Sequence, residues 1–183
     1  MAVKFKPDPK MKTLYMIYLF SFVLLGILSW ALPLTLLFLG DPLAMTIMAV
    51  FVYAPTIFIV AFTVYWVNKY YETVEYVVED DRIVARGGVW WKRESSIPFF
   101  KINNVVFRQG PLQRTLGLAT LGFHTAAIGT YRPEVLFSNL SVEDAQKVRE
   151  MVTEKVVVLG AEKSIAQQML EELRAIRKLL ERK

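Results

Sequence analysis

The sequence predicts an α+β membrane protein, in which a two-helix transmembrane hairpin precedes a sheet-rich domain and a C-terminal amphipathic helix. Three observations predict this class. Residues 13–39 and 42–67 form two apolar blocks without a formal charge. From Glu72 the pattern changes to the period of two that is typical of strands. From Ser141 it changes again, to the period of helices.

Each apolar block is long enough to cross a bilayer, because a core about 30 Å thick requires about 20 helical residues. Gly40-Asp41-Pro42 separates the blocks, and glycine after a helix followed by proline at the start of the next is typical of a tight turn. Pro33 and Pro55 lie inside the blocks and should kink their helices or mark their ends. We therefore expect an antiparallel hairpin over residues 13–69.

Flanking charges predict the orientation of this hairpin. Residues 1–12 are expected to form a basic tail with four lysines against one aspartate, a net charge of +3. The turn carries only Asp41, and cations resume at Lys69. Since cations stay on the cytoplasmic side, the sequence predicts a multi-pass protein of the cell membrane with both termini cytoplasmic.

Composition excludes several kinds of chemistry. The 183 residues include no cysteine and one histidine, His124, so thiolate ligands and cysteine nucleophiles are excluded and a zinc site is disfavoured. We expect no metal, no cofactor and no enzymatic activity. The net charge of +5 fits nucleic acid or an anionic membrane surface, and the apolar blocks favour the membrane. We therefore expect membrane lipids as partners and no nucleic acid.

The middle of the chain predicts an antiparallel meander. Strands are expected at residues 73–78, 82–86, 89–94, 101–107, 117–126 and 134–137. Gly87-Gly88 has the conformational tolerance of a two-residue hairpin turn. Residues 109–114 predict a turn that leads into a short helical segment. Ser141, followed by Asp144, then predicts a capped helix that runs to about residue 156.

The order of these residues resembles the bacterial pleckstrin-homology (PH-like) membrane family, of the YdbS type. The resemblance is carried by Gly87, Arg93, Ile97-Pro98, Lys101-Ile102, Val105, Gln109-Gly110-Pro111-Leu112-Gln113-Arg114, Leu116-Gly117-Leu118 and Thr125-Ala126. It implies two transmembrane helices before one PH-like domain, here residues 70–158. It also implies a strongly bent antiparallel sheet, nearly a barrel, capped by a helix. The family offers no established catalytic residues to transfer.

Residues 161–183 predict a separate amphipathic helix, with Gly160 as a break before it. Its apolar positions are spaced by three and four residues, as in a coiled-coil seam. They are Ala166, Met169, Leu173, Ile176 and Leu180. The helix either packs on its own domain or joins copies of the chain into a homo-oligomer, and we favour the second interpretation.

Several cations and two tryptophans in the domain are candidates for contact with lipid or a partner. They are Trp90, Trp91, Lys92, Arg93, Lys101, Arg108 and Arg114. Held beside an anionic leaflet, each cation could add about 1 kcal/mol of attraction. The alternative is that they are ordinary solvated strand charges. We expect a scaffold that contacts protein or anionic lipid, with an oligomeric channel or transporter subunit as the alternative.

Overall fold

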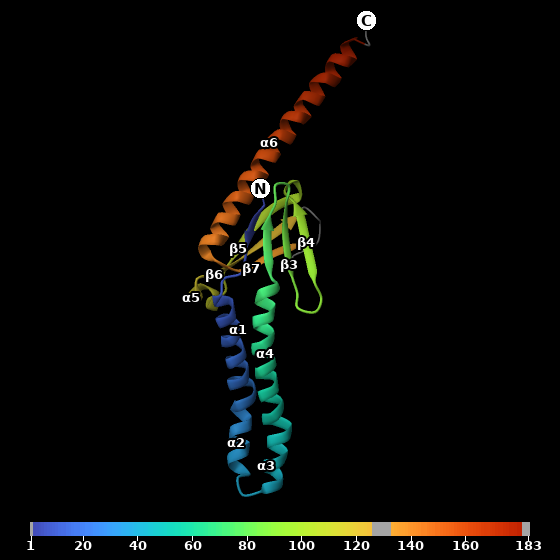
Figure 1. Cartoon of the computed structure of the whole chain (residues 1–183). Helices are drawn as coiled ribbons and strands as arrows, with labels where there is room; N and C mark the ends of the chain where they lie inside the picture. The colour runs from blue at the N-terminus through green and yellow to red at the C-terminus, as the bar shows by residue number, and fades with distance from the viewer. Residues whose placement is uncertain (1, 126–132, 181–183) are drawn as a thin grey trace.

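The computed structural model describes residues 2–125 and 133–180. A helical hairpin forms one end of the molecule, a sheet domain forms the middle, and a long C-terminal helix leaves the domain on the side opposite the hairpin (Figure 1). The described part of the chain is therefore elongated, with three distinct sections along its length.

Two helical rods form the hairpin, and each is long and apolar enough to cross a membrane: Lys10–Leu37 and Pro42–Thr73. The first comprises α1 (Lys10–Ser21), a π-helical segment (Phe22–Leu28) and α2 (Ser29–Leu37). The second comprises α3 (Pro42–Met48), a π-helical segment (Ala49–Tyr53) and α4 (Ala54–Thr73). Both rods start at or before the predicted positions, and the second continues six residues beyond residue 67.

The predicted turn between the rods is confirmed. Asp41 caps α3, because its Oδ1 accepts from the backbone N–H groups of Leu43 (2.9 Å) and Ala44 (3.3 Å). Pro42 occupies the first turn of α3, where its missing N–H leaves no hydrogen bond unmade. Pro55 likewise lies in the first turn of α4, directly after a π-helical segment, whereas Pro33 lies inside α2.

The strand β1 (Val3–Phe5) corrects the expectation of a free basic tail. It pairs antiparallel with β2 (Glu75–Val78), which follows the hairpin, and Lys4 Nζ lies 3.0 Å from Glu75 Oε1. The hairpin is therefore flanked by two strands of one sheet. Its two ends lie on the same side of any bilayer that it crosses.

Two antiparallel sheets make up the domain. The first has the order β1-β2-β3-β4, with β3 at Arg82–Gly87 and β4 at Arg93–Pro98. The second has the order β5-β6-β7, with strands at Ile102–Arg108, Leu118–Thr125 and Val135–Ser141. A 3₁₀ turn, Phe99–Lys101, joins the sheets, and α5 (Pro111–Leu116) lies between β5 and β6. The predicted short helix after Gln109-Gly110 is thus confirmed. Ala126, the expected end of β6, lies outside the described residues.

The apolar core lies between the two sheets and one face of the last helix, α6 (Val142–Leu180). Phe99, Phe123 and Phe137 are fully buried there, and α6 contributes Ala145, Val148 and Val152. The predicted cap of this helix is confirmed, since the backbone N–H of Asp144 donates to Ser141 Oγ at 3.1 Å.

Two predicted boundaries are wrong. Gly160 does not break the helix, because α6 is continuous from residue 142 to 180. A single glycine inside a helix costs only about 1 kcal/mol relative to alanine, which the residues around it can offset. The strand expected at 89–94 begins instead at Arg93, so Trp90 and Trp91 lie in a loop.

Candidate membrane-contact site

The loop of residues 88–92 joins β3 to β4 and carries both tryptophans of interest. Gly88 has a φ of 125°, and a Cβ built on it would lie 1.9 Å from the carbonyl oxygen of Trp91. Only glycine fits such a close approach of backbone to backbone. The loop is therefore held in a shape that leaves Trp90 64% and Trp91 76% exposed.

This loop lies alongside the second rod of the hairpin. The ring centroids of Trp90 and Phe62 in α4 are 6.0 Å apart, at an interplanar angle of 30°. Trp66 and Tyr70 stack one turn further along the same helix, with centroids 5.0 Å apart. In Figure 1 the β3–β4 loop extends from the sheet toward the hairpin end of the molecule. The loop thus reaches about 16 Å along α4 below the domain, at 1.5 Å per residue from Thr73 to Phe62.

A groove with a volume of about 750 Å³ lies between α4, the β3–β4 hairpin and β7. We call it the α4 groove. Its aromatic lining comes from Phe62, Trp66, Tyr70, Tyr76, Trp90 and Trp91. Its strand residues include Ala85, Arg93, Ser95, Leu136 and Ser138. The groove therefore combines an aromatic wall from the hairpin with a more polar wall from the sheets.

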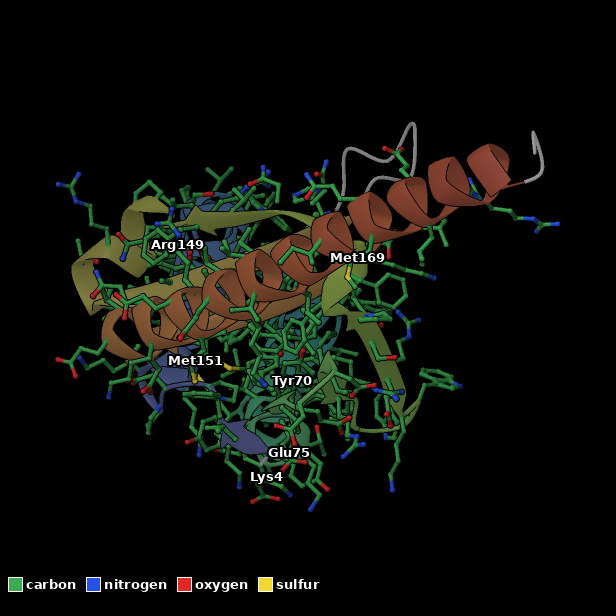
Figure 2. The ribbon with its side chains drawn as sticks, turned by 90° about the horizontal axis from the view of Figure 1, so that it is seen from above. Lys4, Tyr70, Glu75, Arg149, Met151 and Met169 are labelled. Atoms are coloured by element: carbon green, nitrogen blue, oxygen red, sulfur yellow. The ribbon has the colours of Figure 1, made fainter. Side chains whose placement is uncertain are left out.

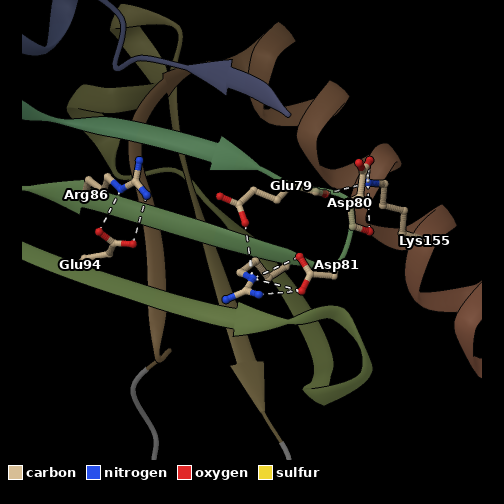
Figure 3. Close-up of polar contacts among 7 residues, drawn as sticks. Glu79, Asp80, Asp81, Arg86, Glu94 and Lys155 are labelled. Atoms are coloured by element: carbon tan, nitrogen blue, oxygen red, sulfur yellow. Dashed lines mark hydrogen bonds and ion pairs between the residues drawn. The ribbon is translucent and has the colours of Figure 1, made fainter. Parts of the chain in front are cut away.

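Strand alternation decides which charges face this groove. Gly87 pairs with Arg93 and Ala85 with Ser95, so these four residues share one face of the β3–β4 hairpin. Arg86 and Glu94 pair on the other face, where the guanidinium donates to the carboxylate at 3.0 and 3.2 Å (Figure 3). This hydrogen-bonded guanidinium holds the pKa of the Glu94 carboxyl below its ordinary value.

The structure separates the remaining predicted cations. Arg108 ends β5 just before α5, and Arg114 lies within α5, which packs near the start of α1, so both lie at the hairpin end of the domain (Figure 1). Lys101 lies at the opposite end of β4 from the tryptophan loop, above the exposed Phe100 ring at 5.9 Å. The seven candidates therefore do not form one patch, and Lys101 is remote from the hairpin.

Two of the residues that carry the family resemblance, Gly110 and Gln113, form hydrogen bonds at the junction of the domain and the hairpin. Gln113 Nε2 donates to Asn139 Oδ1 at 2.8 Å and to Thr120 Oγ1 at 3.1 Å. Its Oε1 accepts from the backbone N–H of Gly110 at 3.0 Å. Asn139 is buried with a φ of 57°, and its carbonyl accepts from the N–H of Asp8, just before α1. This network ties α5 and β7 to the first residues of the hairpin.

Lys155 fastens α6 to the domain. Its Nζ donates to the backbone carbonyl of Glu79 at 2.8 Å and lies 3.7 Å from Asp80 Oδ1 (Figure 3). It also lies 5.0 Å from the centre of the Phe99 ring. Val156 is the last residue of α6 that packs against the core. Beyond it the helix has left the domain.

The projecting part of α6, residues 157–180, carries the predicted seam. Met169 is 60% and Leu173 62% exposed. The side chains of Ala166, Ile176 and Leu180 lie outside what the structure describes. Seen from above, α6 crosses the domain near Met151 and continues past it beyond Met169 (Figure 2). The described side chains of the projecting part therefore do not pack on the domain, contrary to the first of the two interpretations.

Sequence reasoning missed two contributors to the α4 groove. Phe62 is one of many apolar residues in its block, and no sequence signal marks it as the neighbour of Trp90. Tyr76 was assigned only to a strand, yet its hydroxyl donates to the Ser138 carbonyl at 3.0 Å and accepts from the Ser138 N–H at 2.9 Å. Burial raises the pKa of this phenol above its ordinary value, so it stays protonated into the alkaline range.

The described residues contain no group of three or more histidines or acids that could hold a metal ion. His124, in β6, has its Nε2 buried without a hydrogen-bond partner among those residues.

The fold defines a class of proteins in which flanking strands join an apolar helical hairpin to a domain of two antiparallel sheets and a helix. Within it, the chain belongs to the bacterial PH domain family, whose model matches residues 14–156. The match covers the first rod from residue 14, the second rod, the strands β2 to β7 and the packed part of α6, and it supports a PH-like scaffold. No curated protein and no solved structure matches the chain.

Proposed function

We propose that the protein is a membrane-anchored scaffold that self-associates through α6 and presents its PH-like domain to protein or anionic lipid. The hairpin crosses the cell membrane with both termini in the cytoplasm, in the two-span, one-domain arrangement of the YdbS type. The domain binds and positions partners without catalysis. The long projecting helix is the observation that carries this proposal.

The surface of the hairpin supports anchoring. Its exposed side chains include Leu25 (72%), Leu37 (76%), Phe51 (74%) and Phe58 (70%). Burying a side chain of this size contributes about 1.5–3 kcal/mol, which a bilayer supplies and water does not. Tyr65, Trp66 and Tyr70 near the end of α4 match the interfacial belt of membrane helices.

The projecting helix supports self-association. Residues 157–180 extend about 36 Å past the core at 1.5 Å per residue. Val157, Val158, Ile165, Met169, Leu170 and Leu173 are exposed along it. Most helical stability in proteins comes from the packing of an apolar face, so burial of these positions against another copy would stabilise the projecting part. Membrane tethering raises the local concentration of copies and favours such pairing.

The test is the mass of the detergent-solubilised full-length protein by light scattering. Deleting residues 161–183 should convert an oligomer to a smaller particle, because it removes the seam and leaves the packed part of α6. The double substitution Met169→Ser and Leu173→Ser should do the same. Its matched control, Gln168→Ser with Arg174→Ser, changes exposed positions beside the seam and should retain the oligomer. An unchanged mass after the deletion removes α6 from the assembly.

A channel or transporter subunit is the alternative. Residues 13–67 contain no histidine and, apart from Asp41 in the turn, no charged residue, and ion pathways usually require such groups. The polar contact between the rods that the structure shows is a hydrogen bond of 3.1 Å between the Thr35 and Tyr53 hydroxyls. Reproducible ion flux through liposomes containing the purified protein would favour the channel over the scaffold.

A further inference from the structure

The two ends of the α4 groove differ in chemistry. Phe62, Trp66 and Trp90 line it where α4 runs below the domain. Ser95 and Ser138 line it where the strands of the two sheets meet. The aromatic end is continuous with the apolar surface of the rod Pro42–Thr73, which is the part that would lie in lipid. An occupant that fits both ends is amphipathic and enters from the membrane.

Arg86 and Arg93 both line this groove, and Arg93 shares its face of the β3–β4 hairpin with Ala85 and Ser95. The cross-strand partner of Arg93 is Gly87, so β3 places no side chain directly opposite it, and Val74 fills the space at Gly87, where an added Cβ would lie 3.3 Å from its Cγ2. Arg93 is exposed and has no ion-pair partner among residues 2–125 and 133–180. Arg86, by contrast, is engaged by Glu94 on the opposite face. Glu134 also lines the groove, and its carboxylate accepts a hydrogen bond from the Thr125 hydroxyl.

We infer that the α4 groove binds one anionic phospholipid from the leaflet beside the domain, with its phosphate at Arg93 and an acyl chain along Phe62, Trp66 and Trp90. This inference rests on the proposed anchoring of the hairpin. A planar guanidinium matches the geometry of phosphate oxygens. The volume of about 750 Å³ accommodates a headgroup and part of one chain.

A phospholipid fits better than a peptide or a second copy of the chain. The groove opens along a helix face that lipid would already cover, so a lipid reaches it without leaving the bilayer. Tryptophan and a neighbouring cation at this level are typical of residues at the boundary between headgroups and acyl chains.

The experiment is native mass spectrometry of the full-length protein in detergent, titrated with phosphatidylglycerol and, separately, with phosphatidylcholine. We expect one retained phosphatidylglycerol per chain and weaker binding of phosphatidylcholine. Arg93→Gln should raise the apparent Kd for phosphatidylglycerol about fivefold, as expected for the loss of one cation beside an anionic headgroup. Lys101→Gln makes the same charge change away from the groove and should leave the Kd within about twofold of the wild-type value.

A second variant tests the groove without changing charge. Ser95→Phe places a large ring in the polar end, on an exposed strand position where folding tolerates it, and should abolish retention of the lipid. Glycerol 1-phosphate, added as a soluble competitor, should not displace the lipid because it lacks the acyl chain. Equal Kd values for the Arg93 and Lys101 variants, full retention by Ser95→Phe, or displacement by glycerol 1-phosphate would each overturn the inference.

The same spectra report the number of subunits, so the two proposals fail separately. Loss of lipid binding with an intact oligomer overturns the lipid site alone. A monomer that retains the lipid overturns self-association and leaves the lipid site standing. Wild-type protein that retains no phosphatidylglycerol overturns the inference whatever its mass.

Discussion

At the scale of single residues, the two sheets are joined by a small number of specific contacts. The Tyr76 ring stacks on Phe137, with centroids 4.6 Å apart, and its hydroxyl satisfies both backbone groups of Ser138. One side chain from β2 thereby holds β7 of the other sheet. The same tyrosine lines the α4 groove, so the base of the groove and the contact between sheets share a residue.

Tyr76→Phe should lower the free energy of unfolding by about 1–3 kcal/mol, because a buried N–H and carbonyl lose their partner. Thermal unfolding of the detergent-solubilised protein, followed by tryptophan fluorescence, measures the effect. Tyr65→Phe is the control, since Tyr65 is 65% exposed on α4 and should leave the midpoint unchanged. Equal midpoints for both variants would contradict a structural role for the Tyr76 hydroxyl.

Wild-type stability should also depend on Tyr76 at high pH. Burial raises the folded-state pKa of this phenol, so folding favours the neutral form. The contribution is complete below the unfolded value of about 10 and is lost as the pH rises above it. The Tyr76→Phe protein should therefore lose less stability than the wild type between pH 9 and pH 11, in the same unfolding measurement.

At the scale of elements, α6 has two parts with different surroundings. Its first part buries Ala145, Val148 and Val152 in the core, and its second part is exposed. Lys155 marks the point where the helix leaves the domain, by its hydrogen bond to the Glu79 carbonyl. Because α6 is one continuous helix, the direction of the projecting part is set by the packing of the first part against the core, with Lys155 as an added contact at its end.

Lys155→Met should destabilise the domain by about 1 kcal/mol, because a charge-assisted hydrogen bond is lost while most of the apolar stem is kept. The ion pair to Asp80 is exposed and should add little. Lys147→Met, at an exposed position of the same helix, is the matched control. The measurement is the midpoint of unfolding in detergent, and equal midpoints for the two variants would show that Lys155 does not hold α6.

At the scale of the whole molecule, the hairpin and the domain form one connected unit. β1 and β2 pair across the two ends of the hairpin, and the network around Gln113 and Asn139 reaches the residues before α1. The domain therefore sits directly against the hairpin, with the tryptophan loop beside α4. A lipid or partner at the α4 groove would contact both parts together.

Topology can be tested because the natural chain has no cysteine. Gly40→Cys places a thiol at the hairpin tip, where an added Cβ meets no atom within 4 Å. In intact cells a membrane-impermeant maleimide should label this variant. Asn103→Cys, at an exposed position of β5, should be labelled only after the membrane is permeabilised. Labelling of Asn103→Cys in intact cells would contradict the cytoplasmic placement of the domain.

Much of this architecture could be predicted from the sequence, because its signals are local. Uncharged blocks, Asp41-Pro42, Ser141 with Asp144 and the string from Gln109 to Arg114 each encode their structure within a few residues. The pairing of β1 with β2 could not, because a three-residue strand has no periodicity and its partner is about 70 residues away. The continuity of α6 through Gly160 could not be predicted either, because it depends on whether the neighbouring residues offset the low helix propensity of glycine.

The candidate site was predictable only in part. Trp90, Trp91, Lys92 and Arg93 were identified from their chemistry, but the sequence did not reveal which cations share a surface. Strand alternation places Arg93 on the groove side and Glu94 on the other side. A shift of one residue in the register of β4 would exchange the two orientations. The stacking of Trp90 on Phe62 is a long-range contact that no local pattern encodes.

The pairing of β1 with β2 has a consequence for the order of synthesis. At about 5–20 residues per second, the ribosome makes β2 roughly 4–14 s after β1. During that interval β1 has no partner. The sheet can form only if the hairpin returns the chain to the side of the membrane on which β1 lies. A hairpin that inserted only its first rod would leave the two strands on opposite sides of the bilayer. In the proposed membrane topology, completion of this sheet is therefore incompatible with insertion of the first rod alone.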